Sequence, residues 1–584
     1  FFIETTENVD GHNERVITEC SQARYKTHRQ ELGTINQDVV HTNSPQRHDT
    51  YVYYFADGSR STLVLGADDT SCVNGAWIAE LRELDRLEYN NQHTQTRRHC
   101  SLDAQDPEGM GGDYTGDDME FIGRTKELSD LEQEYNNKHS FVVIYGRRRI
   151  GKTALIQEFI KNKPALYFLA TEESEPQSMK RFALSLSQFA NQEFIAKANF
   201  DDWIELFKLF AAVPSKNTKV LVLDEFQYMV NTNPAFTSIF QKAWDEVLSK
   251  QDIMVIICGS YINMMTKQVL AENSPLYGRR TSQIRLAPLP FFDIRQHYHH
   301  KSFSDVVEFY SVTGGIPKYL EFFDNKNSLM DNISRVILNK NGFLYEEPAF
   351  LLNKEVKEPV NYYSVMKAIA QNNHKLSEIA SAMSTEGNKL SPYLETLQGL
   401  YLLEKRVPAT EKNPEKSRKG LYFIRDIFIR FWFMFVFPYK GELELDNLNF
   451  VQDKLKSNFI DNHVAFVYEE ICRNIFAELC KHRKIDFVPS RIGAYWNKNE
   501  EIDLVAIDES HKRMFAAECK YYKDDKPVDV NVYAKLTEKC QVDDFKGYDL
   551  TYGIFSKSGF TKHLRDIVKE NKKLILINEC SVVK

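Results

Sequence analysis

A glycine-rich loop offers the clearest chemistry in this sequence, because its residue types and spacing suit a phosphate site. The loop has the pattern G-x-x-x-x-G-K-T and consists of Gly146, Arg147, Arg148, Arg149, Ile150, Gly151, Lys152 and Thr153. An apolar run at 141–145 precedes it and a helix-forming stretch at 154–160 follows, so backbone N–H groups and a helix start would surround the phosphates. We expect Lys152 to reach the β- and γ-phosphates of ATP and Thr153 to place its hydroxyl on Mg²⁺. The alternative is a chance match in a glycine-bearing loop.

A pair of acids after a second apolar run supports the nucleotide interpretation. Asp224 and Glu225 directly follow the run at 220–223. Asp224 suits the outer coordination of Mg²⁺, and Glu225 suits the base that polarises an attacking water. The alternative is a pair that only caps a helix. Because the pair follows a P-loop, the sequence predicts ATP hydrolysis as well as ATP binding.

Two further residues are candidates for the same site. A third apolar run at 253–258 is followed by Gly259 and Ser260. At this position Ser260 would sense the γ-phosphate. Arg279, in a Gly-Arg-Arg turn, would stabilise charge on the transferring phosphoryl group, either in its own chain or in a neighbouring subunit. The alternative for Arg279 is a solvated surface turn.

A carboxylate cluster is the second constellation with chemical potential. Asp503 lies in an acid-started strand candidate at 499–506, and Glu518 and Lys520 follow another at 514–517. Side chains alternate along a strand, so Glu518 and Lys520 share a face, and antiparallel pairing would bring Asp503 beside them. Two carboxylates can hold Mg²⁺ or Mn²⁺ for phosphodiester cleavage, with Lys520 orienting water and Glu469 completing the metal site. The alternatives are a surface salt bridge and a DNA-binding fold that does not cut.

The elements that must position these residues follow an α/β pattern. Strand candidates separated by helices predict a mostly parallel sheet covered on both faces, and they lie at 141–145, 165–169, 220–223 and 253–258. Residues 303–352 have a helical pattern, and a last α/β segment starts near residue 458.

Between those two parts, the pattern predicts a winged helix. Three helix candidates (362–370, 375–383, 389–400) are followed by two strand candidates (401–407, 420–424). The loop between the strands is net basic, and its cations could contact DNA phosphates: Lys412, Lys416, Arg418 and Lys419. The alternative is a winged helix that serves packing and domain coupling.

Composition bounds the class of protein. The chain has 584 residues, so several domains are expected, and its net charge of −8 argues against a basic coat over the whole molecule. Nine cysteines form no CxxC pair, and no secretory signal is present. The apolar run at 427–437 is interrupted by Arg430 and too short to span a bilayer, so it predicts a buried segment. We expect a cytoplasmic protein without a membrane partner.

The first 118 residues differ from the rest in composition. They contain a predicted β-hairpin at 51–65, a predicted amphipathic helix at 77–89 and a glycine-rich, acidic linker at 106–118. Met119 resembles a second start. Our hypothesis is that residues 1–118 are a fusion or a joined reading frame without a role in the chemistry; the alternative is a small regulatory appendage.

Together these motifs resemble a known family. The segment 121–124, the P-loop, the Asp224-Glu225 pair, Gly259-Ser260, the Gly278-Arg279 pair and the segment 314–317 resemble the archaeal-type ATPase family of the AAA+/STAND group. The resemblance covers about residues 119–350. It implies an α/β core with a helical lid, in which 121–124 lies near the nucleotide base and 314–317 opens a lid helix. It names no substrate.

The carboxylate cluster resembles the PD-(D/E)XK nuclease superfamily. With the segments 493–496 and 556–560, it looks like the uncharacterised domain that follows archaeal-type ATPases, over about residues 455–580. The proline of the superfamily motif is absent, since Ile502 precedes Asp503.

The combined expectation is an α/β protein with a P-loop NTPase sheet, a helical lid, a winged helix and a C-terminal restriction-endonuclease-like domain. The predicted boundaries are 1–118, 119–300, 301–355, 356–445 and 455–584. The expected function is Mg²⁺-dependent ATP hydrolysis coupled to action on DNA, in a chain that could form homo-oligomers. The alternative is an ATP-dependent switch whose C-terminal domain binds DNA or protein without cleaving.

Overall fold

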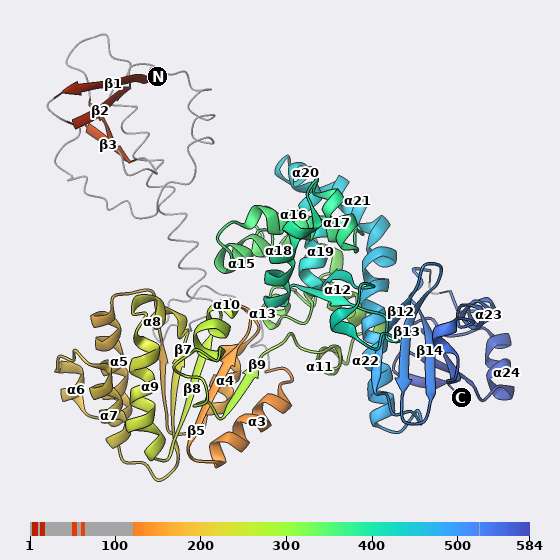
Figure 1. Cartoon of the computed structure of the whole chain (residues 1–584), viewed down its shortest axis with the longest axis horizontal. Coiled ribbons are helices and arrows are strands. Elements are labelled where there is room, and N and C mark those ends of the chain that lie inside the picture. Colours follow the sequence, from red (N-terminus) through yellow and green to blue (C-terminus); the bar gives the residue numbers. More distant parts are fainter. Residues whose placement is uncertain are drawn as a thin grey trace. The chain divides into compact units, whose positions relative to one another are not determined.

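The chain divides into two compact units, Phe1–Tyr114 and Thr115–Lys584. The computed structural model describes residues 121–524 and 526–583 and, before them, only the backbone of four strands (Figure 1). These strands form two antiparallel hairpins: Ile3–Val9 (β1) with His12–Ile17 (β2), and Thr50–Tyr54 (β3) with Arg60–Val64 (β4). The second hairpin confirms the one predicted at 51–65. The predicted helix at 77–89 and linker at 106–118 lie outside the described residues.

A five-stranded parallel sheet forms the core of the first part of the second unit, in the order β6-β7-β8-β5-β9. Its strands are Ser140–Tyr145 (β5), Ala165–Leu169 (β6), Lys219–Asp224 (β7), Ile253–Gly259 (β8) and Ser282–Arg285 (β9). The strands β5, β7 and β8 are buried along their whole length, which is why they are continuous apolar runs in the sequence. The four predicted strands are confirmed. The sequence pattern does not predict β9, because this strand is short and three of its four residues are polar.

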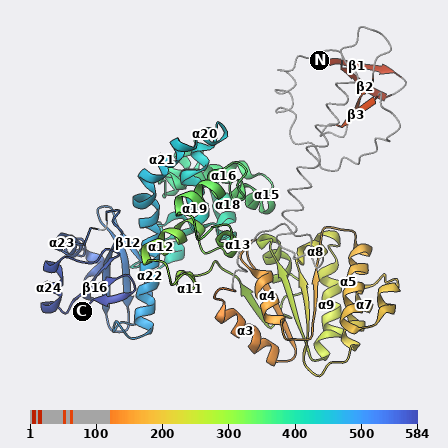
Figure 2. The ribbon, with the colours of Figure 1, turned by 180° about the vertical axis from the view of Figure 1, so that it is seen from behind.

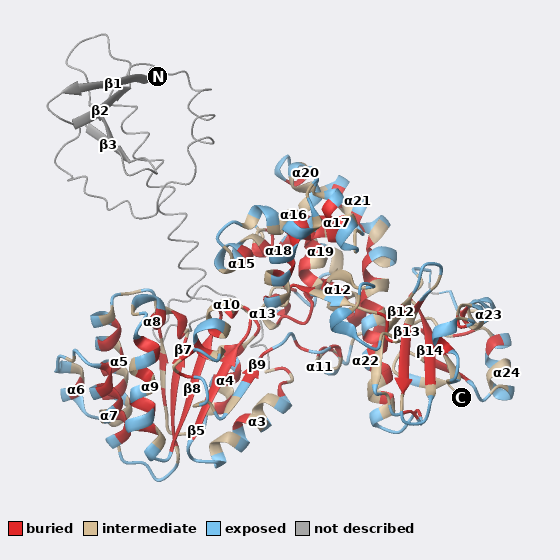
Figure 3. Cartoon of the chain, viewed as in Figure 1, coloured by how far each residue is buried: buried red, intermediate tan, exposed pale blue. Residues whose placement is uncertain are grey.

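Helices cover both faces of this sheet (Figures 1 and 3). Thr125–Asn136 (α3) and Lys152–Ile160 (α4) pack on one face, through Leu131, Leu155 and Phe159. The other face is covered by an aromatic layer from Glu175–Ala190 (α5), Trp203–Ala212 (α7) and Phe236–Glu246 (α9). Two short helices complete this part, Glu193–Lys197 (α6) and Gln227–Thr232 (α8).

Helices follow the sheet, as the pattern at 303–352 predicts. After β8 the chain forms Ile262–Met264 (α10) and a π-helical segment, Met265–Leu270, before it returns as β9. The helices of this part are Phe291–His297 (α11), Phe303–Thr313 (α12), Pro317–Glu321 (α13), Leu329–Ile333 (α14) and Glu347–Glu355 (α15). Gly314 adopts a φ of 61° and ends α12, so the chain turns sharply into α13.

Three helices and a hairpin come next, in the predicted order. The helices are Pro359–Ala370 (α16), Leu376–Ala382 (α17) and Gly387–Gly399 (α18). Leu403–Arg406 (β10) then pairs antiparallel with Leu421–Ile424 (β11). The apolar run follows as Ile427–Phe435 (α19), in which Phe428, Phe431 and Trp432 are buried, confirming a core segment. Among the described residues, no helix combines the length and apolar character needed to cross a membrane.

A six-stranded mixed sheet forms the last part of the chain. Lys440–Glu444 (α20), Leu448–Phe459 (α21) and Ala465–Lys481 (α22) lead into it. Its strands, in spatial order, are Arg491–Trp496 (β12), Glu501–Asp508 (β13), Arg513–Lys520 (β14), Asp549–Ser556 (β15), Leu574–Asn578 (β16) and Ser581–Val583 (β17). The pairs β14–β15 and β15–β16 are parallel and the others antiparallel. Helix α22 packs on one face, while Val530–Lys539 (α23) and Lys562–Glu570 (α24) pack on the other (Figure 2).

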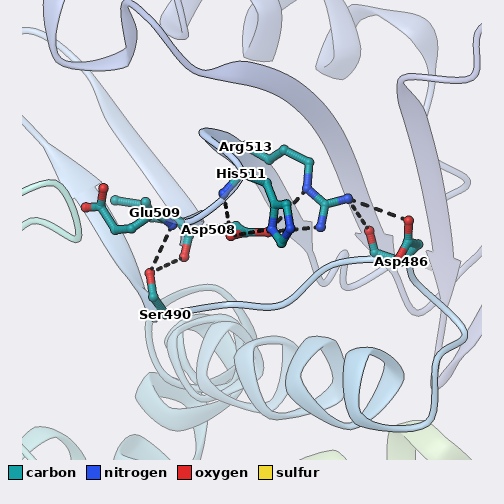
Figure 4. Close-up of polar contacts among 7 residues, drawn as sticks. Asp486, Ser490, Asp508, Glu509, His511 and Arg513 are labelled. Atoms are coloured by element: carbon teal, nitrogen blue, oxygen red, sulfur yellow. Dashed lines mark hydrogen bonds and ion pairs between the residues drawn. The ribbon is translucent and has the colours of Figure 1, made fainter.

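The turn between β13 and β14 is held by a polar cluster (Figure 4). Asp508 accepts hydrogen bonds from Arg513 Nη2 at 2.9 Å and from the His511 backbone N–H at 3.1 Å. Arg513 also donates to the carbonyl of Asp486 at 3.0 Å. The Arg513 and His511 contacts outweigh burial and lower the pKa of Asp508 to about 2. This cluster fixes the antiparallel register of the two strands that carry the carboxylate site.

Candidate functional site

The phosphate loop lies between β5 and α4 and depends on both of its glycines. Gly151 has a φ of 86°, and a Cβ on Gly146 would lie 2.6 Å from the carbonyl oxygen of Leu286. Lys152 is buried, and its Nζ donates to the carbonyl oxygens of Gly146 and Arg147, each at 3.0 Å. The ammonium group therefore lies within the loop at the start of α4, where an anion is favoured.

The side chains of two loop arginines pair with acids at the starts of α19 and α15. Arg147 forms an ion pair with Asp426, and Arg149 forms one with Glu347. Ile150 is buried in the core beneath α4. The loop backbone and its arginine side chains thus have different partners, which the motif alone does not indicate.

Asp224 connects the strand end of β7 to the P-loop threonine. Its Oδ2 accepts hydrogen bonds from Thr153 Oγ1 at 2.8 Å and from the Tyr167 hydroxyl at 2.6 Å. Its Oδ1 accepts the backbone N–H of Glu225 at 2.8 Å. The structure therefore brings Thr153 and Asp224 together, as predicted. Tyr167 was missed, because its place beside Asp224 depends on β6 neighbouring β7, which the sequence does not reveal.

Glu225 is held in a constrained conformation at the end of the same strand. Its φ is 51°, a left-handed value that is uncommon for a residue other than glycine. Ser260 Oγ donates to its Oε1 at 2.8 Å, and the Gln227 side-chain amide donates to its Oε2. Burial raises the pKa of Glu225, and Asp224 adds to the rise while Lys152 opposes it. A carboxyl with a raised pKa suits a group that takes up a proton.

Arg279 lies at the other edge of the sheet. Arg279 precedes β9. Thr281, between Arg279 and β9, bonds to Phe141 at the beginning of β5, whereas the phosphate loop follows the end of β5. The two are separated by the length of the strand, roughly 15 Å. Arg279 is paired there with Asp245 at 2.9 Å. The structure does not bring Arg279 to the phosphate loop of its own chain.

The carboxylate site forms where β13 begins and β14 ends. Lys520 Nζ lies 2.5 Å from Glu518 Oε2 and 3.6 Å from Asp503 Oδ2. Asp503 Oδ2 also accepts the backbone N–H of Cys519 at 2.7 Å. The three residues that the motif proposes therefore converge. Burial raises the pKa of Asp503 to about 6, with Glu518 adding to the rise, and both carboxylates raise the pKa of Lys520 against the effect of burial.

A second lysine, Lys539 on α23, completes the charge balance at this site. Its Nζ lies 2.7 Å from Glu518 Oε1 and 2.8 Å from the carbonyl oxygen of Glu501. Glu518 is thus placed between two ammonium groups, one on each carboxylate oxygen. Nothing in the sequence around Lys539 indicates this role, because α23 is brought to β14 only by the fold.

Glu469 on α22 lies near the site without joining Asp503 and Glu518 in one ligand set. Burial, with Asp503 as the next cause, raises its pKa to about 8. Within residues 121–524 and 526–583, no group of three His, Cys, Asp or Glu side chains is close enough to hold a metal. Asp503 and Glu518 both face the same cation, Lys520 Nζ, at 3.6 Å and 2.5 Å.

The hairpin β10–β11 is attached to the edge of the C-terminal sheet. Ala409 N–H donates to the Ala494 carbonyl at 2.8 Å, and Trp496 Nε1 donates to the Lys419 carbonyl at 3.2 Å. The four predicted cations of the loop are exposed, and none of them forms an ion pair with another described residue: Lys412, Lys416, Arg418 and Lys419. We call these four residues the loop cations.

The sheet, the phosphate loop, the Thr153–Asp224 contact and the acid Glu225 define a P-loop ATPase. A family described as "ATPase domain predominantly from Archaea" matches residues 121–323, and one described as "Archaea bacterial proteins of unknown function" matches residues 432–531. An uncharacterized protein of Methanocaldococcus jannaschii is 33% identical over 442 residues, which cover 75% of this chain and 95% of that protein. The chain belongs to this archaeal ATPase family.

Other comparisons are shorter or more distant. An uncharacterized ATP-binding protein of Methanocaldococcus jannaschii is 50% identical over 44 residues, covering 7% of this chain and 75% of that protein. A Walker-type ATPase of Pyrococcus abyssi superposes with a TM-score of 0.43 at 18% identity, covering 57% of this chain and 99% of that one. The ORC2 protein of Aeropyrum pernix superposes with a TM-score of 0.35 at 13% identity, covering 59% and 98%.

Proposed function

We propose that the protein hydrolyses ATP with Mg²⁺ at the phosphate loop and uses this reaction to act on DNA through its C-terminal region. The observation that carries the ATPase half is the contact between Thr153 and Asp224 beside a buried Lys152. A hydroxyl of the P-loop and a carboxylate at the end of β7, 2.8 Å apart, fit the inner and outer coordination of one Mg²⁺. That ion would neutralise charge on the β- and γ-phosphates.

Residues of the chain would bind the phosphates and accept the proton of the attacking water. Loop N–H groups and Lys152 bind and orient the phosphates, and Glu225 accepts the proton of the attacking water. Ser260 and Gln227 hold the Glu225 carboxylate, so both must release or turn it before it reaches a water molecule. Arg279 would act only on the site of a neighbouring copy, after leaving its pair with Asp245. An exposed pair of this kind costs roughly 0–1 kcal/mol to break.

The proposed DNA contacts are the loop cations and the carboxylate site, which lie on connected elements. Trp496, which bonds to Lys419, is paired across β12–β13 with Glu501, and the carbonyl of Glu501 contacts Lys539 of the carboxylate site. A three-helix unit with a basic hairpin loop matches a winged helix, and cations at its tip can bind phosphates without reading bases. One phosphate backbone could then pass from the loop to the carboxylates.

For the cutting step, Asp503 and Glu518 would hold a divalent ion, which supplies activation of water and charge stabilisation at the phosphate. Lys520 and Lys539 hold Glu518 in place, and Lys520 can orient the attacking water. The domain boundaries at residues 119–300, 301–355, 356–445 and 455–584 belong to this proposal. Residues 1–118 have no part in it.

Incubation of plasmid and branched DNA with Mg²⁺ or Mn²⁺, with and without ATP, tests the DNA half. We expect cleavage by the wild type, its loss in Glu518→Gln, and wild-type cleavage in Glu538→Gln, which changes an exposed acid of α23. ATP hydrolysis that persists in Glu518→Gln would show that the two sites are separate. DNA left intact by the wild type under all conditions would contradict the nuclease proposal.

A second candidate is a switch that binds DNA or protein without cutting. The position of Glu518 between two ammonium groups favours it, because its charge is already compensated inside the chain. Light scattering with ATP, ADP and no nucleotide separates the two candidates. The switch requires a nucleotide-dependent change in mass or partner binding with little turnover, and a single mass in all three states would contradict its assembly form.

A further inference from the structure

Carboxylates from two distant parts of the chain pair with cations of the phosphate loop. Asp426, at the start of α19, pairs with Arg147, and Glu347, at the start of α15, pairs with Arg149. The exposed fractions of these four side chains are 6%, 8%, 3% and 10% in that order. Both arginines belong to the loop that holds phosphate, and neither acid belongs to the ATPase sheet.

Tyr319 of α13 joins the two ion pairs. Arg147 Nη2 donates to the Tyr319 hydroxyl at 2.6 Å, and that hydroxyl donates to Glu347 Oε1 at 2.8 Å. The Tyr319 ring is fully buried and packs at a tilt against Phe428 of α19, with 4.7 Å between ring centroids and 56° between ring planes. Helices α13, α15 and α19 thus share one hydrogen-bonded network with the loop.

The other end of α15 reaches the opposite side of the nucleotide site. Glu355 accepts the backbone N–H groups of Ile262 at 3.0 Å and Asn263 at 3.4 Å, directly after Ser260. Burial raises the pKa of Glu355, and the positive charges of Lys152 and Arg148 act against the rise. Helix α15 thus contacts the phosphate loop through Glu347 and the segment that follows Ser260 through Glu355.

Stability alone does not account for these buried ion pairs. Charges removed from water lose hydration, so a buried ion pair is often no better than apolar packing of the same volume. The loop arginines are also the groups that would bind phosphate best, since a guanidinium fork matches phosphate oxygens. An ATP molecule would bring several negative charges to the cations that now pair with Asp426 and Glu347.

We propose that Asp426 and Glu347 form a nucleotide-responsive latch. Closed, they hold α13, α15 and α19 on the phosphate loop; a bound triphosphate competes for the loop cations and weakens the hold. Asp426 also accepts the Ile429 N–H at 2.9 Å as the cap of α19, which follows β11 closely. Loss of the Arg147 contact therefore reaches the hairpin that carries the loop cations. The latch rests on the proposed binding of ATP at this loop.

Nucleotide affinity of latch variants tests this inference. Glu347→Gln and Asp426→Asn keep shape and remove charge, so each should bind a non-hydrolysable ATP analogue more tightly, by on the order of 5- to 50-fold. The matched control is Glu346→Gln, the neighbouring residue, which pairs with Lys440 instead of the loop. Both latch variants should also melt at a lower temperature without ligand, a combination that a purely structural pair does not produce.

The outcomes separate the latch from the ATP-binding proposal. If the wild type binds the analogue and both variants bind it equally or more weakly, the latch is wrong and the nucleotide site stands. If neither the wild type nor any variant binds it, both proposals fail.

Hydrogen exchange of the unmodified protein gives a second measurement that does not depend on a variant folding. The latch predicts faster exchange in residues 347–355 and 426–430 when the analogue is added, because the carboxylates lose their partners. Slower or unchanged exchange in both segments would overturn the latch.

Discussion

The phosphate loop and the carboxylate site are opposite in charge but alike in design. At the loop, cations that would bind an anionic nucleotide are paired with Asp426 and Glu347 from distant helices. At the carboxylate site, the acid that would bind a metal cation is paired with Lys520 and Lys539. In each case a charged side chain of the protein occupies the place of the ligand's charge. A ligand that binds would therefore displace this side chain instead of pairing with an unpaired charge.

The two sites differ in how far apart in the sequence their residues lie. The loop residues follow one another in the sequence, and only their acidic partners come from elsewhere. The carboxylate site draws on β13, β14 and α23, with Glu469 of α22 nearby. A ligand at the loop can therefore move separate helices, whereas a metal at the carboxylates would act within one sheet.

The largest expected effect comes from removing the central cation of the loop. Lys152→Ala should lower ATP turnover by about two to three orders of magnitude, because the ammonium stabilises charge that develops on the phosphates. Lys161→Ala, an exposed lysine at the other end of α4, is the matched control. The measurement is phosphate release at saturating ATP, and turnover retained in Lys152→Ala would separate the loop from the reaction.

The next effect concerns the loop cations. Changing all four to Gln should make the dependence of log affinity for duplex DNA on log salt concentration shallower by roughly 3 to 4 units, since each lost phosphate contact removes about 0.9. A variant with four exposed lysines of the ATPase part changed to Gln controls for net charge: Lys126, Lys180, Lys208 and Lys242. Equal salt-dependence slopes in the two variants would contradict DNA binding by the hairpin loop.

A smaller effect is expected from the second lysine of the carboxylate site. Lys539→Met removes one of the two cations that compete with a divalent ion for Glu518, so Mn²⁺ affinity should rise about threefold to tenfold. Lys535→Met, on the exposed face of the same helix, should leave it unchanged. Calorimetric titration with Mn²⁺ measures this, and weaker binding in Lys539→Met would make Lys539 a positioning residue for Glu518.

The smallest expected effect concerns the pH dependence of stability and comes from His463. His463 is buried; its Nε2 donates to the Ser311 carbonyl at 2.6 Å and its Nδ1 accepts from Arg430 Nη1 at 2.6 Å. Its pKa is lowered by burial and then by Arg430. The folded protein keeps it neutral, while the unfolded chain takes up a proton below its ordinary value of 6.5. Its contribution to stability is therefore present above that pH and lost as pH falls.

We expect the wild-type Tm to fall between pH 7.5 and 5.5 and to fall less in His463→Gln. His299→Gln changes an exposed histidine and should keep the wild-type slope. Identical slopes in all three proteins would contradict a lowered pKa of His463 in the folded protein.

The sequence predicts contiguous features well. Residues 141–153 form strand, loop and helix as expected, because a buried parallel strand is a continuous apolar run and the glycines mark the turn. The convergence of Asp503, Glu518 and Lys520 follows from strand alternation and one antiparallel pairing, so it could also be predicted. The buried run at 427–435 is indicated by its aromatic residues.

Features that depend on tertiary neighbours could not be predicted. Tyr167 reaches Asp224 because β6 lies beside β7, and Lys539 reaches Glu518 because α23 crosses β14. Arg279 looks like a catalytic cation in the sequence, yet strand direction places it at the far edge of the sheet. The acids that hold Arg147 and Arg149 lie roughly 200 to 280 residues further along the chain, beyond the range of local patterns.

Phosphate release by the wild type and by Glu225→Gln, with Mg²⁺ and ATP and with and without duplex DNA, tests the central claim most directly. The account predicts wild-type turnover that DNA increases, and a Glu225→Gln variant that binds ATP but releases almost no phosphate. Equal release by the two proteins, or wild-type release that is independent of Mg²⁺ and DNA, would contradict an ATPase that acts on DNA through this site.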